Sequence, residues 1–141
     1  LHACDIATDL ALGTAIRAKA KYIACVPCCH KELLDQYTMP GLEPLTKFGV
    51  FKARFNDVLT DSMRALKLEA EGYKVSVVEY ISPLDTPKNL LIRATRTGKV
   101  NNRAKAEYDA VRRTLGTTSE LDRRCAELDN EFFITDEDLM G

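Results

Sequence analysis

The chain has 141 residues, with 20 lysines and arginines against 21 aspartates and glutamates, and 45% of its residues are hydrophobic. These values predict one globular domain with a buried core, and they exclude a disordered chain and a collagen-like repeat. The formal charge of −1 gives no overall electrostatic attraction to nucleic acid. Without a bilayer-length apolar run or a basic leader before an apolar stretch, we expect a soluble protein with no membrane partner.

The beginning of the chain predicts a strand followed by a helix and a second strand. The first strand is expected to end near His2. Apolar residues at helical spacing predict a helix over 8–20, with Thr8 or Asp9 as its N-cap. The short apolar run over 22–27 then predicts a buried strand that ends at a proline.

The middle of the chain predicts two further helices. One is expected to begin around 28–31 and to end before Met39, where a proline and a glycine follow. The longest helical pattern covers 51–71, and Gly72 is its expected end.

The last part of the chain predicts two strands and two helices. Strands are expected over 74–81 and 89–96, and they form an antiparallel pair because no helix separates them. Helices are expected over 102–115 and 119–130, the second opened by a Ser-x-x-Asp capping box.

Alternating helices and strands predict an α/β sheet with all its strands together. In such sheets, ligands bind in the crevice beyond the carboxyl ends of the strands. The two expected strand ends are His2–Asp5 and Pro27–His30, which is also where thiol and polar residues gather. This coincidence makes the two segments the candidate functional site.

The five cysteines indicate a reducing compartment. Their number is odd, and Cys28 and Cys29 are adjacent, whereas secreted disulfide frameworks usually have an even number in a short chain. We therefore expect reduced thiols and a cytoplasmic location. One alternative function is a thiol–disulfide redox module, because Cys25 and Cys28 form a C-x-x-C motif. Against it, Cys25 is expected inside a strand and not exposed at a helix start.

A metal-binding module is a further alternative function for Cys25 and Cys28. The simplest interpretation is that these thiols pack as small hydrophobic side chains. Zinc sites need about four convergent ligands. Cys28, Cys29 and His30 are contiguous and cannot satisfy tetrahedral geometry alone, and only Cys4 and His2 could complete the set. We expect no zinc bound by these three residues, and no metal site is predicted.

The acidic residues divide into structural and functional candidates. Asp9 is expected to be a helix cap, and Asp5 is expected to point into the crevice. Asp57, Asp61 and Arg64 lie on one face of the long predicted helix and are expected to be solvated ion pairs.

The stretch 88–124 is basic, with ten lysines and arginines against four acidic residues. A solvated helix face explains this composition, and a non-catalytic RNA-binding module is the alternative function.

Several motifs, in this order, resemble a family of S-adenosylmethionine-dependent methyltransferases. They are Leu1–Asp5 with Ala7–Asp9, Val26–His30, Arg54–Phe55, Leu59–Asp61, Arg64–Ala65, Gly72–Val75 and Thr86–Ala94. The first two are also distantly similar to a eukaryotic family of tRNA 2′-O-methyltransferases that act on the acceptor stem. Asp5 stands where that family has a glycine.

The resemblance implies the carboxyl-terminal half of a Rossmann-like methyltransferase sheet, mixed and with an antiparallel last strand pair. This half would occupy 1–98, followed by a helical extension with an acidic tail over 99–141. The family's glycine-rich turn for the cofactor has no counterpart, because no G-x-G occurs in the chain. We therefore expect sequence upstream of Leu1, a chain inactive alone, and an open sheet edge that favours self-association or a partner segment.

The resemblance also implies roles for single residues. S-adenosylmethionine is the implied cofactor, and its contacts would come from His2, Ala3, Cys4, Asp5 and Asp9. The acceptor side would include Pro27, Cys29, Lys31, Lys88 and Asn89. The acceptor itself is unidentified, with RNA as a candidate.

Methyl transfer to oxygen or nitrogen needs a proton acceptor. His30 is the expected base, because its ordinary pKa lies near neutrality. Asp5 is the alternate base, and Cys28 as a covalent nucleophile ranks third.

Overall fold

The computed structural model describes residues 3–131. Its elements in chain order are α1 (Ala3–Arg17), β1 (Tyr22–Cys25), the 3-10 helix η1 (Glu43–Thr46), α2 (Gly49–Ala70), β2 (Tyr73–Glu79), β3 (Leu90–Arg96), α3 (Asn102–Leu115) and α4 (Glu120–Glu131). Within this range, no helix combines the length and the apolar character that a bilayer crossing requires. The fold is a mixed α/β arrangement, as predicted, but its three-stranded sheet is antiparallel throughout and not the mixed sheet expected.

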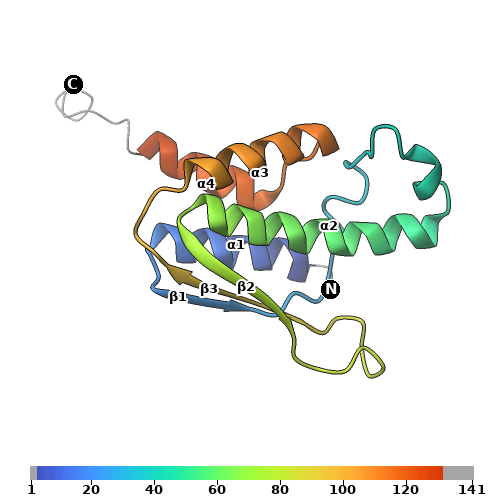
Figure 1. The fold of residues 1–141 in the computed structure, drawn as a ribbon, viewed down its shortest axis with the longest axis horizontal. Helices are drawn as coiled ribbons and strands as arrows, with labels where there is room; N and C mark the ends of the chain where they lie inside the picture. Colours follow the sequence, from blue (N-terminus) through green and yellow to red (C-terminus); the bar gives the residue numbers. More distant parts are fainter. Residues whose placement is uncertain (1–2, 132–141) are drawn as a thin grey trace.

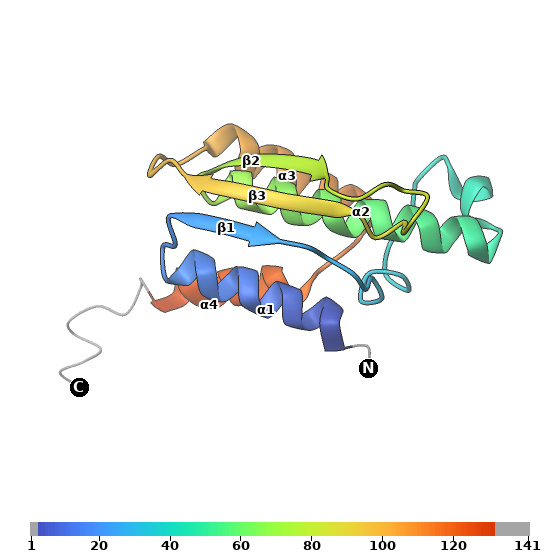
Figure 2. The same cartoon turned by 90° about the horizontal axis from the view of Figure 1, so that it is seen from below.

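The sheet has three strands in the order β1-β3-β2, and both outer strands run antiparallel to β3. Consequently β1 and β2 run parallel to each other, with β3 inserted between them. Figure 1 shows the helices on one side of this sheet, and Figure 2 shows β1 at the edge nearest to α1. On the other face, Arg93 contacts Ser76 and both are exposed.

The core lies between the sheet and the helices. Alternation along β3 buries Ile92 and Ala94 and exposes Arg93, as expected for a strand covered on one face. Helix α4 packs on α1, and α3 packs on α2. One cluster joins the sheet to α1 and α4 through Leu12, Ile16, Ile23, Leu68, Tyr73, Ile92, Ala94, Leu121 and Cys125. A second joins α2 and α3 through Tyr37, Met63, Ala70, Tyr108 and Leu115.

The second half of the chain follows the sequence predictions closely. The pair β2–β3 is antiparallel, with Val77 opposite Ile92, and α2 and α3 lie within two residues of their expected bounds. The capping box at α4 is confirmed, because the Ser119 backbone N–H donates to the Asp122 carboxylate while Ser119 Oγ accepts from the Asp122 N–H. Gly72 follows α2 with a φ of +87°, and an added Cβ would meet the Lys99 carbonyl oxygen at 2.8 Å.

The beginning of the chain differs from its prediction. The expected strand end at His2 lies outside the described residues, but Ala3 to Asp5 belong to α1 and not to a strand. The predicted start of this helix at residue 8 is therefore wrong by five positions. Thr8 is inside the helix, where its hydroxyl donates to the Cys4 carbonyl, so it is not an N-cap.

The helix predicted from about 28–31 to 39 is also wrong. The segment forms hydrogen-bonded turns, with the N–H groups of Gln36 and Tyr37 both donating to the Leu33 carbonyl. The next N–H, that of Thr38, donates to the Leu115 carbonyl at the end of α3. This tertiary contact replaces the hydrogen bond that would continue the helix.

Candidate active site

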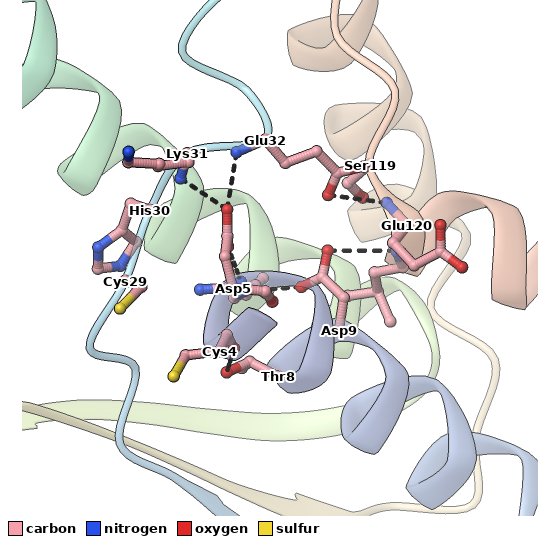
Figure 3. A network of polar contacts seen from close by, with 12 residues as sticks. Cys4, Asp5, Thr8, Asp9, Cys29, His30, Lys31, Glu32, Ser119 and Glu120 are labelled. Atoms are coloured by element: carbon pink, nitrogen blue, oxygen red, sulfur yellow. Dashed lines mark hydrogen bonds and ion pairs between the residues drawn. The ribbon is translucent and has the colours of Figure 1, made fainter. Parts of the chain in front are cut away.

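The loop after β1 is fastened to the first turns of α1 by one carboxylate. Asp5 Oδ2 accepts hydrogen bonds from the backbone N–H groups of Lys31 and Glu32, both at 2.7 Å. Figure 3 shows this side chain between the two segments. Asp5 is only 1% exposed, so the expectation that it points into an open crevice is wrong. The contact brings the two sequence-predicted site segments together.

Arg64 of α2 holds the acidic residues of this region. Its Nη2 donates to Asp5, its Nε donates to Asp9 Oδ1 at 2.8 Å, and its Nη1 lies 3.3 Å from Asp61 Oδ1. Arg64 is 2% exposed, so the interpretation of Asp61 and Arg64 as a solvated surface pair is wrong. A buried charge needs partners of opposite charge, and α1 and α2 supply them.

Asp9 is not the cap of its own helix. Its second carboxylate oxygen, Oδ2, accepts from the Leu121 N–H at 3.3 Å, in the first turn of α4. Asp9 therefore stabilises the amino end of a helix more than a hundred residues away in the sequence. Periodicity within α1 gives no signal for such a contact.

The two buried carboxylates differ in pKa direction. Burial raises the pKa of Asp5, but the hydrogen bonds from Glu32 and Lys31 and the charge of Arg64 together bring it below the ordinary value. For Asp9, burial is again the largest effect, and the Arg64 contact does not offset it, so its pKa is raised. Asp5 is thus held as a carboxylate, which is unsuitable for taking up a proton near neutrality.

His30 lies in the same region, with a side chain that is 1% exposed. Its Nε2 is 2.8 Å from Asp61 Oδ1, and its Nδ1 is 3.0 Å from Lys88 Nζ. A lysine ammonium can only donate, so its contact with Nδ1 is consistent with a lone pair there and with Nε2–H donating to Asp61. Asp57 Oδ1 also lies 3.5 Å from the same Nδ1. The backbone of His30 is fixed as well, because Asn56 donates to its carbonyl at 2.9 Å.

A small cavity lies beside this histidine. Its volume is about 80 Å³, which is room for a few atoms of a ligand. It is lined by Pro27, His30, Asp57, Val58, Asp61, Pro87, Lys88 and Leu90. Lys88 enters it from the loop between β2 and β3 and forms an ion pair with Asp57. Asn89 is buried and donates to the Ile81 carbonyl, which holds the two ends of that loop together.

The thiols form a separate group next to this network. The sulfur atoms of Cys4, Cys28 and Cys29 all lie within 4.8 Å of one another, and those of Cys28 and Cys29 are 3.8 Å apart. Its neighbours, Cys29 first, raise the pKa of the exposed Cys28 thiol. Cys25 is half-buried within β1, and burial raises its pKa to about 11. Both shifts disfavour the thiolate that a nucleophile or redox thiol needs.

The remaining predicted residues are distributed unevenly. Pro27 is buried beside His30, Cys29 is half-buried, and Lys31 is exposed. His2 lies outside the described residues, and Ala3 is the first residue of α1. Part of the basic stretch is paired within the protein, since Arg123 pairs with Glu32 and Glu120, and Arg124 pairs with Glu120 and Glu127.

Sequence reasoning missed the α2 side of the site. Asn56, Asp57, Thr60, Asp61 and Arg64 recur at helical spacing, and four of them are buried. The signal was present as a polar stripe on a helix that also has an apolar stripe. A second stripe of this kind indicates that a helix contacts protein on two sides.

Comparisons with known proteins match only part of this chain. A family described as a methyltransferase domain matches residues 1–36, the segment that carries Cys4, Asp5, Cys28, Cys29 and His30. A "Glutathione S-transferase C-terminal domain-containing protein" from Homo sapiens is 28% identical, over 65% of this chain and 18% of that protein. Proteins of the same description from Macaca fascicularis and Mus musculus match with the same identity and coverage. The chain spans less than a fifth of the length of these relatives, and no solved structure matches it.

Proposed function

We propose that this protein takes part in S-adenosylmethionine-dependent methyl transfer, and that the residues around His30 form the methyl-acceptor side of the site. The observation that carries the proposal is that the family match and the two segments joined by Asp5 lie in the same part of the chain. The methyltransferase match covers residues 1–36, and this is the stretch whose two polar segments Asp5 fastens together. The sheet supports the proposal, because an antiparallel strand between two parallel ones suits the edge of a mixed sheet.

In this proposal His30 takes up the proton that the acceptor group loses. The cofactor supplies an electrophilic methyl group on a sulfonium, and the protein positions the acceptor and removes its proton. Asp61 orients the imidazole and stabilises the positive charge that forms on it. Nδ1 becomes available when Lys88 keeps its ion pair with Asp57 and gives up its contact with the ring. The proton then passes from the acceptor oxygen or nitrogen to Nδ1.

Asp5 has a positioning role here instead of the role of alternate base. Both of its carboxylate oxygens are occupied, by Arg64 on one side and by two backbone N–H groups on the other. The same contacts, with those of Asp9, mean that these two carboxylates do not fit the role of cofactor ligands expected for them. We therefore assign the acceptor side of the site to this chain.

RNA is the acceptor class to test first. Lys31 is exposed one position after His30, and Lys88 is partly exposed beside it, so both can approach a phosphate group. The redox alternative is less favoured, because Cys25 lies inside a strand with a raised pKa. The glutathione transferase name belongs to relatives of which this chain spans 18%.

The test measures transfer of a radiolabelled methyl group by the complete gene product to RNA, to small thiols and to protein, as separate acceptor pools. His30→Gln should lower kcat roughly 100-fold, the usual contribution of a general base, and leave the KM for the cofactor unchanged. Asp85→Asn, in an exposed turn of the neighbouring loop, is the matched control. Failure of the wild-type protein to transfer methyl to any pool, or equal kcat in His30→Gln, would overturn the proposal.

A further inference from the structure

The three clustered thiols are brought together by contacts that do not involve sulfur. Cys4 precedes Asp5, and Cys29 lies two positions before Lys31, so the Asp5 contacts fix Cys4 next to the loop. The Thr8 hydroxyl bonds to the Cys4 carbonyl in the same turn. Figure 3 shows the Cys4 and Cys29 side chains on the same side of the Asp5 contacts. The cluster is therefore preorganised by neighbouring hydrogen bonds, as first-row metal sites commonly are.

We propose that Cys4, Cys28 and Cys29 bind one Zn²⁺ ion through three thiolates and leave a fourth coordination position for an exogenous ligand. Zinc–sulfur bonds of about 2.3 Å in tetrahedral geometry place two sulfurs about 3.8 Å apart. The Cys28 and Cys29 sulfurs are 3.8 Å apart, and Cys4 lies within 4.8 Å of both. Three sulfurs at this spacing need only a small side-chain rotation to share one ion.

The donor set selects the ion and its coordination number. Three thiolates favour a soft or borderline ion such as Zn²⁺ over Mg²⁺ or Ca²⁺, which bind oxygen. Among residues 3–131, no fourth histidine, cysteine or carboxylate joins the cluster. His30 is excluded because both of its ring nitrogens are hydrogen bonded, to Asp61 and to Lys88. This set differs from the contiguous set Cys28, Cys29 and His30, for which the sequence predicts no zinc.

Binding is an exchange of protons for metal. Three S–H bonds are replaced by three zinc–sulfur bonds, and three protons are released to solvent, so the affinity should rise with pH. Cys4 and Cys28 are exposed, which gives the ion a path from solvent. The fourth position would hold water or a donor atom of a ligand, as in zinc sites with three protein ligands. The site does not depend on methyl transfer.

The experiment titrates the reduced chain with Zn²⁺ and, separately, with Co²⁺, whose near-ultraviolet charge-transfer absorption reports bound thiolates. We expect one ion per chain, a tetrahedral cobalt spectrum, and at least tenfold weaker binding in Cys4→Ala, Cys28→Ala and Cys29→Ala. Cys25→Ala is the matched control and should bind as wild type, and circular dichroism checks that each variant is folded. No binding by wild type, unchanged affinity in Cys4→Ala, or equal loss in Cys25→Ala would overturn the proposal.

Discussion

Arg64 reaches Asp5 twice, because its Nη2 donates both to the carboxylate and, at 2.9 Å, to the backbone carbonyl of that residue. The two residues are 59 positions apart, on α2 and α1. The same guanidinium contacts Asp9 and Asp61. One side chain thus connects the two helices that flank the candidate site.

Removing this guanidinium should destabilise the protein strongly. Arg64→Met keeps most of the side-chain volume but leaves Asp5, Asp9 and Asp61 without their shared partner. We expect a loss of about 3–5 kcal/mol in the free energy of unfolding, the usual cost of breaking a buried ion pair. Denaturant unfolding measures this. Arg103→Met, which removes an exposed pair with Glu107, should unfold at nearly the same denaturant concentration as wild type. Equal losses in both variants would contradict the prediction.

Acid should weaken the contribution of Asp5 in a predictable range. Its folded-state pKa lies below the ordinary value of 3.8, so the carboxylate form stabilises the fold. This stabilisation is complete above about pH 5 and is lost as the pH falls through the lowered folded-state pKa. Asp5→Asn should therefore be less stable than wild type by about 2–3 kcal/mol at pH 7.

The difference between the two proteins should shrink below about pH 4, where the wild-type carboxylate begins to bind a proton. Asp9 works in the opposite direction, because its raised pKa favours the protonated form in the fold. Because Asp9 shares Arg64 with Asp5, the comparison is repeated in an Asp9→Asn background, which removes this second titration. A stability difference that stays constant from pH 7 to pH 2.5 would show that the Asp5 charge is not what the fold uses.

The ring protons of His30 give a direct test of the geometry. Because Lys88 donates to Nδ1, the Nε2–H tautomer should be the dominant form of the neutral ring, which ¹⁵N-resolved NMR of the imidazole distinguishes. The chain has two histidines, so the His2→Ala variant leaves a single ring to observe. Lys88→Met should then shift the Nδ1 resonance without unfolding the protein. The Nδ1–H tautomer in wild type would contradict this reading of the contact.

Residues 1–141 alone should bind S-adenosylmethionine poorly. The chain contains no G-x-G turn, and the carboxylates expected to contact the cofactor are held by Arg64. We expect titration calorimetry to give a Kd weaker than about 100 µM, or roughly −5.5 kcal/mol. His30→Ala should not change it, since that residue is assigned to the acceptor. A Kd in the low micromolar range would show that the cofactor site is complete in this chain.

Hydrophobic spacing and turn residues predicted the helices and strands whose ends depend on residues nearby in the sequence. The β2–β3 pair and α2 follow from hydrophobic spacing, and Gly72 ends α2 where a positive φ is needed. The start of α1 could not be predicted in this way, because its first acidic residues face Arg64 and not the helix's own N–H groups. The turns after His30 likewise depend on a partner in α3.

Some residues of the candidate site could likewise be predicted from local sequence, and others could not. His30, Cys28 and Asp5 could be selected from the sequence because they lie in two short motifs with unusual residue types. Arg64 and Asp61 could not, because an arginine three positions after an aspartate is the ordinary pattern of a solvated helix face. Only the packing of α1 and the loop against α2 shows that this face is buried.

The hydrogen bonds between Asp5 and the loop after β1 also restrict how the backbone of that loop opens to solvent. Lys31 and Glu32 belong to no helix or strand, yet their N–H groups are enclosed by the buried carboxylate of Asp5. Their hydrogens can exchange with solvent only when the loop separates from Asp5 of α1, so these two amides should exchange more slowly than other amides outside the helices and strands. Their exchange rates would thus report the rare subglobal opening that gives bulk solvent access to His30.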